Sequence, residues 1–246
     1  MYNNPITQRN LEGLRSLGYH IMDPAEGWLA CGITGVGRLP EPEAIVEWLE
    51  SKMFSTNELE GTTILVTAGG TQENIDPVRY IGNRSSGKMG YAIADQAARM
   101  GAQVILVSAP TSLPVPSGVD FVSVDSALSM QEAVEARYND VNVVIMAAAV
   151  SDFRALHKAE QKIKKMESMT IELVKNPDIL QGLGSKKSHQ VLVGFAAETE
   201  HVIKYGQDKV ARKNLDMLVA NDVSKSNAGF NVDTNEGYFL YPNKEP

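Results

Sequence analysis

The run TTILVTAGGT, residues 62–71, decides how this sequence folds. Its centre, residues 64–67, is a short block of apolar and β-branched residues, a pattern typical of a strand buried on both faces. Two glycines follow after one alanine, so the backbone can turn tightly where this strand ends. A buried strand followed by a small-residue turn predicts the first strand of a parallel sheet, with a ligand-binding edge just beyond residue 68.

The alternation of strand and helix patterns continues along the chain. Further apolar blocks predict strands at residues 104–107, 121–124, 143–146, 191–195 and 217–220. Helices are expected at 89–100, at 126–138 with Ser126 as a cap, and at 199–213. This order predicts an α/β protein with a doubly wound, Rossmann-like, mostly parallel sheet and helices on both faces. Because such sheets bind ligands beyond the carboxyl ends of their strands, we expect chemistry just after residues 68, 108, 147, 195 and 220.

The residues before this pattern have a different character. We expect a helix at 7–16, a loop rich in glycine and proline, and a helix at 42–52 that has a proline near its start. A short polar segment then leads to the sheet. The predicted organisation is an N-terminal part at 1–54, a linker at 55–61 and a main domain at 62–246.

The bulk composition argues against several classes of function. The 246 residues carry a net charge of −7 with acidic and basic residues mixed, which disfavours nucleic-acid and membrane-surface partners. We find no apolar run of membrane-spanning length and no signal peptide. The single cysteine, Cys31, excludes an intrachain disulfide, so a cytoplasmic location is expected.

The glycine turn after the first strand favours phosphate binding, because backbone N–H groups can approach an anion there. A dinucleotide fingerprint would place a helix directly after this turn, but residues 72–87 intervene. An NAD(P)-dependent oxidoreductase would also need an acidic residue after the second strand, where Ser108, Ala109 and Pro110 stand instead. This alternative is disfavoured and stays open.

The segment GNRSSGKM, residues 82–89, resembles a P-loop up to its last position. Met89 replaces the serine or threonine whose hydroxyl would bind Mg²⁺, and the segment does not follow a strand directly. It therefore does not predict a Walker site. Ser85, Ser86 and Gly87 do lie at a predicted helix N-terminus, which favours an anion. The alternative is that Ser85 or Ser86 only caps the helix.

Later candidates each have a functional and a structural interpretation. After the fourth strand, alanines would let a ligand lie on the backbone, and Asp152 would accept hydrogen bonds from a ribose or base or merely form a turn. The basic run at 162–165 is a solvated loop or a mobile flap that brings a lysine onto phosphate. Asn176 and Pro177 are predicted as the cap and first residue of a short helix that could border a nucleotide.

Two further features are open in the same way. Phe195 ends a predicted strand and either covers a base or belongs to the core. Lys209 and Lys213 share a helix face, which either binds a triphosphate or is an ordinary wet surface. Each signal is weak alone. Together they describe a nucleoside triphosphate site without the usual motifs.

Residues 63–241 resemble the phosphopantothenate–cysteine ligase family. The motifs that carry the resemblance lie at 67–71, 76–81, 83–90, 148–152, 162–165, 175–178, 194–199 and 213–214. The resemblance implies that a nucleoside triphosphate, CTP in bacterial members, activates the carboxylate of 4′-phosphopantothenate with Mg²⁺ present. An acyl-nucleotide and pyrophosphate form, and the amine of L-cysteine then displaces the nucleoside monophosphate.

The resemblance also implies roles for individual residues. Lys162 supports the first half-reaction and Asn83 the second. The positions that match nucleotide-binding residues are Asp152, Lys162, Pro177, Asp178, Ile179, Leu180, Phe195, Lys209 and Lys213. Those expected near phosphate or substrate are Gly69, Gly70, Ser85, Ser86, Gly87, Lys88, Ala148 and Ala149. We identify no metal-ligating side chain, and we expect Asp76 and Arg79 to form a structural ion pair. A homodimer through this domain is expected by the same resemblance.

Residues 1–53 resemble the end of the flavin-dependent phosphopantothenoylcysteine decarboxylase, through motifs at 4–11, 30–32 and 37–42. In that family the cysteine of the Ala-Cys-Gly motif, here Cys31, acts as an acid on an enethiol intermediate. The FMN-binding core would lie upstream of Met1, so decarboxylation by this chain alone is not expected. The chain resembles a fragment cut at both ends. A nucleotide-binding but inactive chain and a lyase acting through Cys31 remain the alternatives.

Overall fold

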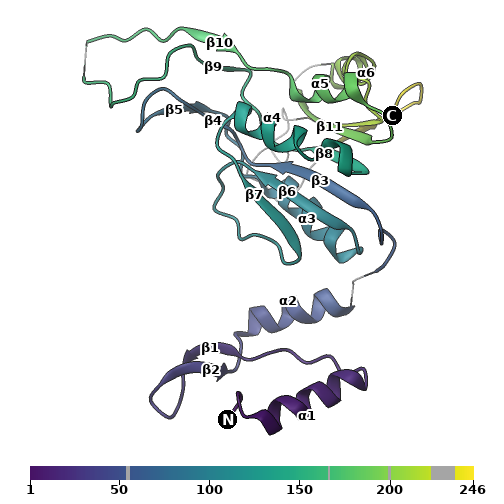
Figure 1. Cartoon of the computed structure of the whole chain (residues 1–246). Helices are drawn as coiled ribbons and strands as arrows, with labels where there is room; N and C mark the ends of the chain where they lie inside the picture. Colours follow the sequence, from purple (N-terminus) through teal and green to yellow (C-terminus); the bar gives the residue numbers. More distant parts are fainter. Residues whose placement is uncertain (54–55, 166, 199–200, 223–235) are drawn as a thin grey trace. The chain divides into compact units, whose positions relative to one another are not determined.

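The computed structural model describes residues 1–53, 56–165, 167–198, 201–222 and 236–246. Ser55 of the expected linker and residues 199–200, where a helix was expected to begin, lie outside the described residues. The chain divides into two compact units, Met1–Ser55 and Thr56–Pro246. Figure 1 labels the elements of both units.

A seven-stranded sheet in the order β13-β12-β11-β8-β3-β6-β7 forms the second unit. The strands are β3 (Thr63–Ala68), β6 (Gln103–Ser108), β7 (Val119–Ser123), β8 (Val143–Met146), β11 (Val191–Glu198), β12 (Met217–Asp222) and β13 (Gly237–Leu240). All neighbours pair in parallel except β12 and β13, which are antiparallel. The predicted mostly parallel α/β sheet is therefore confirmed, and the edge strand β13 is an addition that the sequence did not predict.

Helices cover both faces of this sheet (Figure 1). They are α3 (Lys88–Arg99), α4 (Ala127–Glu135), α5 (Ile179–Lys186) and α6 (Val202–Arg212). On β3, Ile64 and Val66 belong to one buried cluster, which includes alanines of α3. Leu65 belongs to the other, which includes side chains of α4, α5 and α6. Because successive strand residues face opposite sides, α3 covers one face and the other three helices cover the second. The buried block at 64–67 is thus the centre of a two-sided core.

Ser126 is confirmed as the cap of α4. Its Oγ accepts a hydrogen bond from the N–H of Ser129 at 3.3 Å, and the Oγ of Ser129 accepts one from the N–H of Ser126 at 3.0 Å. The helix is shorter than predicted, because α4 ends at Glu135 and a 3-10 turn, η1 (Tyr138–Asp140), follows.

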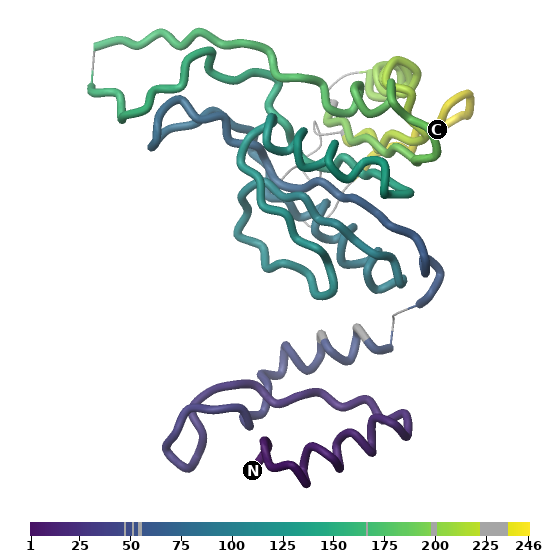
Figure 2. The backbone as a smooth tube through the Cα atoms, in the orientation of Figure 1, coloured from purple at the N-terminus to yellow at the C-terminus, as the bar shows by residue number. Residues whose placement is uncertain are grey.

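Two antiparallel hairpins that the sequence did not predict are inserted between the main elements (Figure 2). β4 (Gln72–Asn74) pairs with β5 (Tyr80–Gly82) between β3 and α3. β9 (Phe153–Ala155) pairs with β10 (Leu173–Lys175) between β8 and α5, and the loop between them contains the basic run. Each strand has three residues, too few for an alternating pattern to be recognised.

The first unit contains α1 (Pro5–Ser16), β1 (Ala25–Trp28), β2 (Thr34–Arg38) and α2 (Pro42–Met53). Its two predicted helices are confirmed, but the glycine- and proline-rich segment holds the β1–β2 hairpin and is not wholly a loop. None of its described side chains is fully buried. Among the described residues of both units, no helix is long and apolar enough to cross a membrane.

Candidate functional site

The glycine turn after β3 and the start of α3 are packed against each other. Gly69 has φ +78°, and a Cβ added there would stand 2.6 Å from the carbonyl oxygen of Ala109. Gly87 has φ +79°, and its added Cβ would stand 2.6 Å from Cγ2 of Thr111 and 3.5 Å from Cα of Gly69. Both positions therefore require glycine for conformation and for space.

The ends of β3 and β8 are joined directly beside this turn. The N–H of Ala149 donates to the carbonyl of Gly69 at 2.8 Å, and the N–H of Thr71 donates to the carbonyl of Ala149 at 3.2 Å. The side-chain amide of Asn83, an exposed residue, donates to the same Ala149 carbonyl at 3.3 Å. Strands β3 and β8 are parallel neighbours, so these contacts lie at the carboxyl edge where chemistry was predicted.

Several of the residues expected near phosphate or substrate gather here with Asn83. A Cβ on Gly70 would stand 2.9 Å from the carbonyl oxygen of Asn83 and 3.3 Å from Cβ of Ser85. Thr67 of β3 fixes the backbone of Ala148, whose N–H donates to Oγ1 of Thr67 at 3.1 Å. Gly69 and Gly70 are buried, so the surface at this point is formed by the half-buried Ser85, Ala148 and Ala149 and by the exposed Asn83.

The N-terminus of α3 adjoins this surface. Its N-cap is Gly87, which provides no side-chain cap, and the helix begins at Lys88. The N–H of Lys88 lies 3.5 Å from Oγ of Ser86, at the limit of a hydrogen bond. The N-cap position is therefore Gly87 and neither serine, although Oγ of Ser86 accepts from the first helical N–H. A twelve-residue helix that begins beside the glycine turn favours an anion at this point.

Asp178 and Lys213, both predicted at the nucleotide, form an ion pair. Nζ of Lys213 lies 2.8 Å from Oδ2 of Asp178, and neither side chain is more than about one-third exposed. Partial burial opposes ionisation of Asp178, but the hydrogen bonds from Lys213 and from the backbone N–H of Gln181 outweigh it, so the pKa of this carboxyl is lowered. Lys209 lies one turn earlier on α6 and is half-buried, while Lys213 is the C-cap of that helix.

The predicted start of the short helix is corrected by two residues. The N-cap of α5 is Asp178 and not Asn176, because Oδ1 of Asp178 accepts from the N–H of Gln181 at 3.0 Å. Asn176 is buried, and its amide donates to the carbonyl of Ser151 at 2.8 Å while its oxygen accepts from Arg154. Pro177 consequently precedes the N-cap and is not the first helical residue.

The remaining predicted nucleotide residues divide between the core and the surface. Ile179 and Leu180 are buried in the core, so their side chains are not available to a ligand. Phe195 is half-buried on β11, beside Val219 of β12 in register. Asp152 is exposed just after β8, and its carbonyl accepts from the N–H of Asn176 at 2.8 Å.

The expected ion pair of Asp76 and Arg79 is confirmed, and it has a further partner. Asp76 is buried, and the hydrogen bond from Arg79 lowers the pKa of its carboxyl well below the usual range against the effect of burial. The same carboxylate also accepts from the N–H of Ile163, the residue after Lys162. In the sequence, this contact is indicated by one apolar residue, Ile163, within the lysine run at 162–165.

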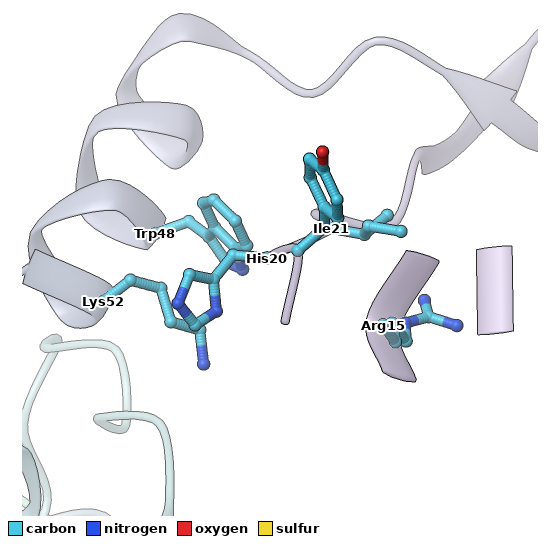
Figure 3. Close-up of a pocket in the computed structure, with 6 residues that line it drawn as sticks. Arg15, His20, Ile21, Trp48 and Lys52 are labelled. Carbon is cyan, nitrogen blue, oxygen red and sulfur yellow. The ribbon is translucent and has the colours of Figure 1, made fainter. Parts of the chain in front are cut away.

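The first unit holds a cavity of about 230 Å³. It is lined by Arg15, Tyr19, His20, Ile21, Trp48 and Lys52, five of which Figure 3 labels. None of the residues predicted for the nucleotide or substrate lines it.

Cys31 is exposed in the turn between β1 and β2. Among the described residues of the whole chain, no group of three His, Cys, Asp or Glu side chains is arranged to hold a metal ion.

Comparison with known proteins assigns both units. Residues 59–246 match the family described as the DNA/pantothenate metabolism flavoprotein C-terminal domain, and residues 1–54 match a flavoprotein family. The sequence is 48% identical over 239 residues to the coenzyme A biosynthesis bifunctional protein CoaBC of Bacillus subtilis. It is 49% identical over 240 residues to the protein of the same name from Escherichia coli K12. Both alignments cover 96% of this chain but 59% of the relative, so the chain spans about three-fifths of their length.

Solved structures agree with this assignment. The crystal structure of the C-terminal domain of a CoaBC protein shares 45% sequence identity and a TM-score of 0.63, covering 75% of this chain and 88% of that one. A DNA/pantothenate metabolism flavoprotein from Streptococcus pneumoniae has the same fold, with a TM-score of 0.66 at 23% identity over 75% of this chain and 90% of that one.

The packing at Gly69 leads to a stability prediction. Gly69→Ala is expected to lower the free energy of unfolding by roughly 1–3 kcal/mol, because alanine is strained at positive φ and its Cβ would meet Ala109. Gly182→Ala on α5 is the matched control, since its Cβ meets nothing within 4 Å, and it is expected to be neutral or stabilising by up to about 1 kcal/mol. Urea unfolding followed by circular dichroism measures both. Equal stability of Gly69→Ala and the unmodified chain would show that the turn tolerates a side chain.

Proposed function

This chain belongs to the family of the DNA/pantothenate metabolism flavoprotein C-terminal domain, and on that premise we propose that it joins 4′-phosphopantothenate to L-cysteine through an acyl-nucleotide intermediate. Its relatives are named for coenzyme A biosynthesis, and the matched family covers the whole sheet unit from residue 59. The observation that carries the proposal is the convergence of the glycine turn, Asn83, Ala149 and the start of α3 at one edge of the sheet.

In the first half-reaction the carboxylate of 4′-phosphopantothenate attacks the α-phosphate of CTP, and pyrophosphate leaves. Negative charge grows on the phosphate oxygens, so the step requires cations and N–H donors. Lys162 is assigned to the reacting phosphate. Gly69, Gly70 and the residues 85–88 are assigned to phosphate groups, where backbone N–H groups and the helix dipole favour anions. Mg²⁺, bound chiefly by phosphate oxygens and water, would offset the negative charge of the triphosphate.

In the second half-reaction the amine of L-cysteine attacks the acyl carbon, and cytidine monophosphate leaves. Asn83 is assigned to this step because an amide donates to the acyl oxygen without adding a charge. Its side chain donates to the Ala149 carbonyl at 3.3 Å, a long bond that a substrate oxygen can replace at small cost. The backbone of Ala148 and Ala149 then forms a wall of the acyl pocket.

The nucleotide is assigned to the edge formed by Asp152, Phe195 and the start of α5. Lys209 and Lys213 are its cationic residues. In this arrangement the Asp178–Lys213 ion pair orients the ammonium before the nucleotide binds, and the base lies against Phe195. A homodimer through this unit is part of the same proposal.

The oxidoreductase alternative loses support in the structure. A dinucleotide site needs the turn after the first strand to open directly into a helix, so that the pyrophosphate meets the helix N-terminus. Here the β4–β5 hairpin stands between β3 and α3. Two alternatives remain. A chain that binds nucleotide without turnover is distinguished by pyrophosphate release, and a lyase acting through Cys31 would be recognised by flavin absorbance of the purified chain.

Pyrophosphate release tests the proposed function directly. With Mg²⁺, 4′-phosphopantothenate and CTP, the purified chain is expected to release pyrophosphate, and added cysteine is expected to give multiple turnovers. Parallel reactions with ATP identify the nucleotide. CTP binding without release would support the non-catalytic alternative, and the absence of both would reject the ligase assignment for this chain.

Lys162→Gln is expected to slow pyrophosphate release by roughly 100-fold or more, because the cation at the reacting phosphate is lost. Single-turnover pyrophosphate release measures this step without cysteine. Lys158→Gln is the matched control, since Lys158 is an exposed lysine of the same loop with no assigned role, and it is expected to react at the unmodified rate. Normal release by Lys162→Gln would remove Lys162 from the mechanism.

Asn83→Asp is expected to form the acyl-nucleotide but to pass it to cysteine roughly 100-fold more slowly, since a carboxylate repels the developing oxyanion. Mass spectrometry of quenched reactions would reveal the accumulated intermediate. Asn139→Asp introduces the same charge in η1, before the amino end of β8, and is expected to transfer normally. If Asn83→Asp forms product at the normal rate, the assigned role of Asn83 is wrong.

A further inference from the structure

The loop that carries Lys162 is attached to the β4–β5 hairpin at two points. The N–H of Ala159 donates to the carbonyl of Ile75 at 2.9 Å. Four residues later, the N–H of Ile163 donates to Oδ2 of Asp76 at 3.1 Å, and Nη2 of Arg79 donates to the carbonyl of Ile163 at 3.0 Å. Figure 1 shows the β4–β5 hairpin next to the β9–β10 hairpin, although the two hairpins are far apart in the sequence.

The carboxylate of Asp76 holds several backbone groups at once. Oδ1 accepts from the N–H groups of Val78 and Arg79 at 2.8 and 2.9 Å. Oδ2 accepts from Nε and Nη2 of Arg79 and from the N–H of Ile163. A buried carboxylate with this many donors is stable only while they all remain in place, because each lost partner leaves a buried charge less satisfied. The turn and the loop are thus linked through one side chain.

These contacts fix the backbone at the position of Lys162. The N–H of Ile163 belongs to the peptide group that joins it to Lys162, and its carbonyl belongs to the next peptide group. Since each peptide group is planar and contains both flanking Cα atoms, holding the first group places Cα of Lys162, and holding both fixes the chain direction at Ile163. The Ile163 residue is half-buried, whereas Lys162 and Lys164 on either side are exposed. The basic run 162–165 is therefore anchored at its one apolar residue, and its lysines are exposed.

We propose that Asp76 and Arg79 are positioning residues for Lys162, which they hold through the backbone of Ile163. The pair does not touch the substrate in this assignment. It reduces the range of positions that the Lys162 ammonium samples, so that less freedom is lost when the lysine meets the reacting phosphate. The inference deepens the proposed ligase function and rests on the role of Lys162 in it, whereas the tether itself is a property of the fold.

Asp76→Asn in the full chain tests the tether without reference to catalysis. Asparagine keeps the shape but replaces one acceptor oxygen by a donor group, which cannot accept from Ile163 and Arg79. Trypsin cleaves after lysine and arginine, so limited proteolysis with mass spectrometry is expected to show cleavage in 158–165 accelerated by roughly 10-fold or more, as local opening becomes easier. An unchanged cleavage rate would overturn the tether.

The same variant tests positioning through its kinetics. The turnover number for pyrophosphate release is expected to fall roughly 100-fold, while CTP affinity stays within about threefold, since misplacement of a reacting group slows the chemical step more than it weakens binding. Faster proteolysis with normal pyrophosphate release would overturn the positioning role. If the unmodified chain releases no pyrophosphate, the ligase proposal is rejected for this chain, and the positioning role is rejected with it. The proteolysis experiment would still test the tether between Asp76 and Ile163.

Matched variants separate this effect from general loosening. Asp95→Asn breaks another Asp–Arg pair, in which Nε of Arg99 donates to Oδ2 of Asp95 at 2.9 Å on α3, and it is expected to change neither readout. Val134→Ala lowers stability through the core and is expected to leave turnover unchanged. Arg79→Lys retains the positive charge but loses the two guanidinium donors to Asp76, so it is expected to change proteolysis and turnover in the same direction by a smaller factor. This variant also keeps the test available if Asp76→Asn does not fold. Equal slowing by Val134→Ala would attribute the loss to instability and overturn the proposal.

Discussion

Close backbone approach at the carboxyl end of β3 is the constraint on which the rest of the site depends. At Gly69 the chain passes so near the Ala109 carbonyl that a Cβ would stand 2.6 Å from it, and Gly87 is equally confined by Thr111. These two contacts place the start of α3 against the strand end. The hydrogen bonds between Ala149 and the Gly69–Thr71 turn then add β8 to the same point. The proposed anion site at this edge would therefore be formed by peptide groups and a helix N-terminus.

Two aspartates organise the charges around this edge in different ways. Asp76 is buried, and its carboxylate is satisfied by Arg79 and by three backbone N–H groups, so it acts on the fold. Asp178 is partly exposed and pairs with Lys213, so it holds the lysine ammonium at the start of α5. The first pair connects the hairpin inserted after β3 with the loop inserted after β8. The second connects the start of α5 with the end of α6. Each pair thus joins segments that are distant in the sequence.

The sequence predicted the elements of the sheet well because burial on two faces leaves a clear signal. The block at 64–67 and its later counterparts are continuous runs of apolar residues, and Ser126 has the side-chain chemistry of a cap. The three-residue strands of β4, β5, β9 and β10 gave no such signal. Asn176 was misassigned because capping and interior hydrogen bonding use the same side-chain groups. Its neighbours Ser151 and Arg154, which bind it in the fold, are remote in sequence.

The sequence by itself determined the α/β sheet and the family resemblance, since local periodicity and motif order are properties of the chain alone. Only the tertiary structure decided which candidates meet. It placed Asn83 beside Ala149, paired Asp178 with Lys213, buried Ile179 and Leu180, and connected Asp76 to the residue after Lys162. These contacts join residues between 35 and 87 positions apart in the sequence. They depend on how the inserted hairpins pack, and no local pattern specifies a packing partner at that separation.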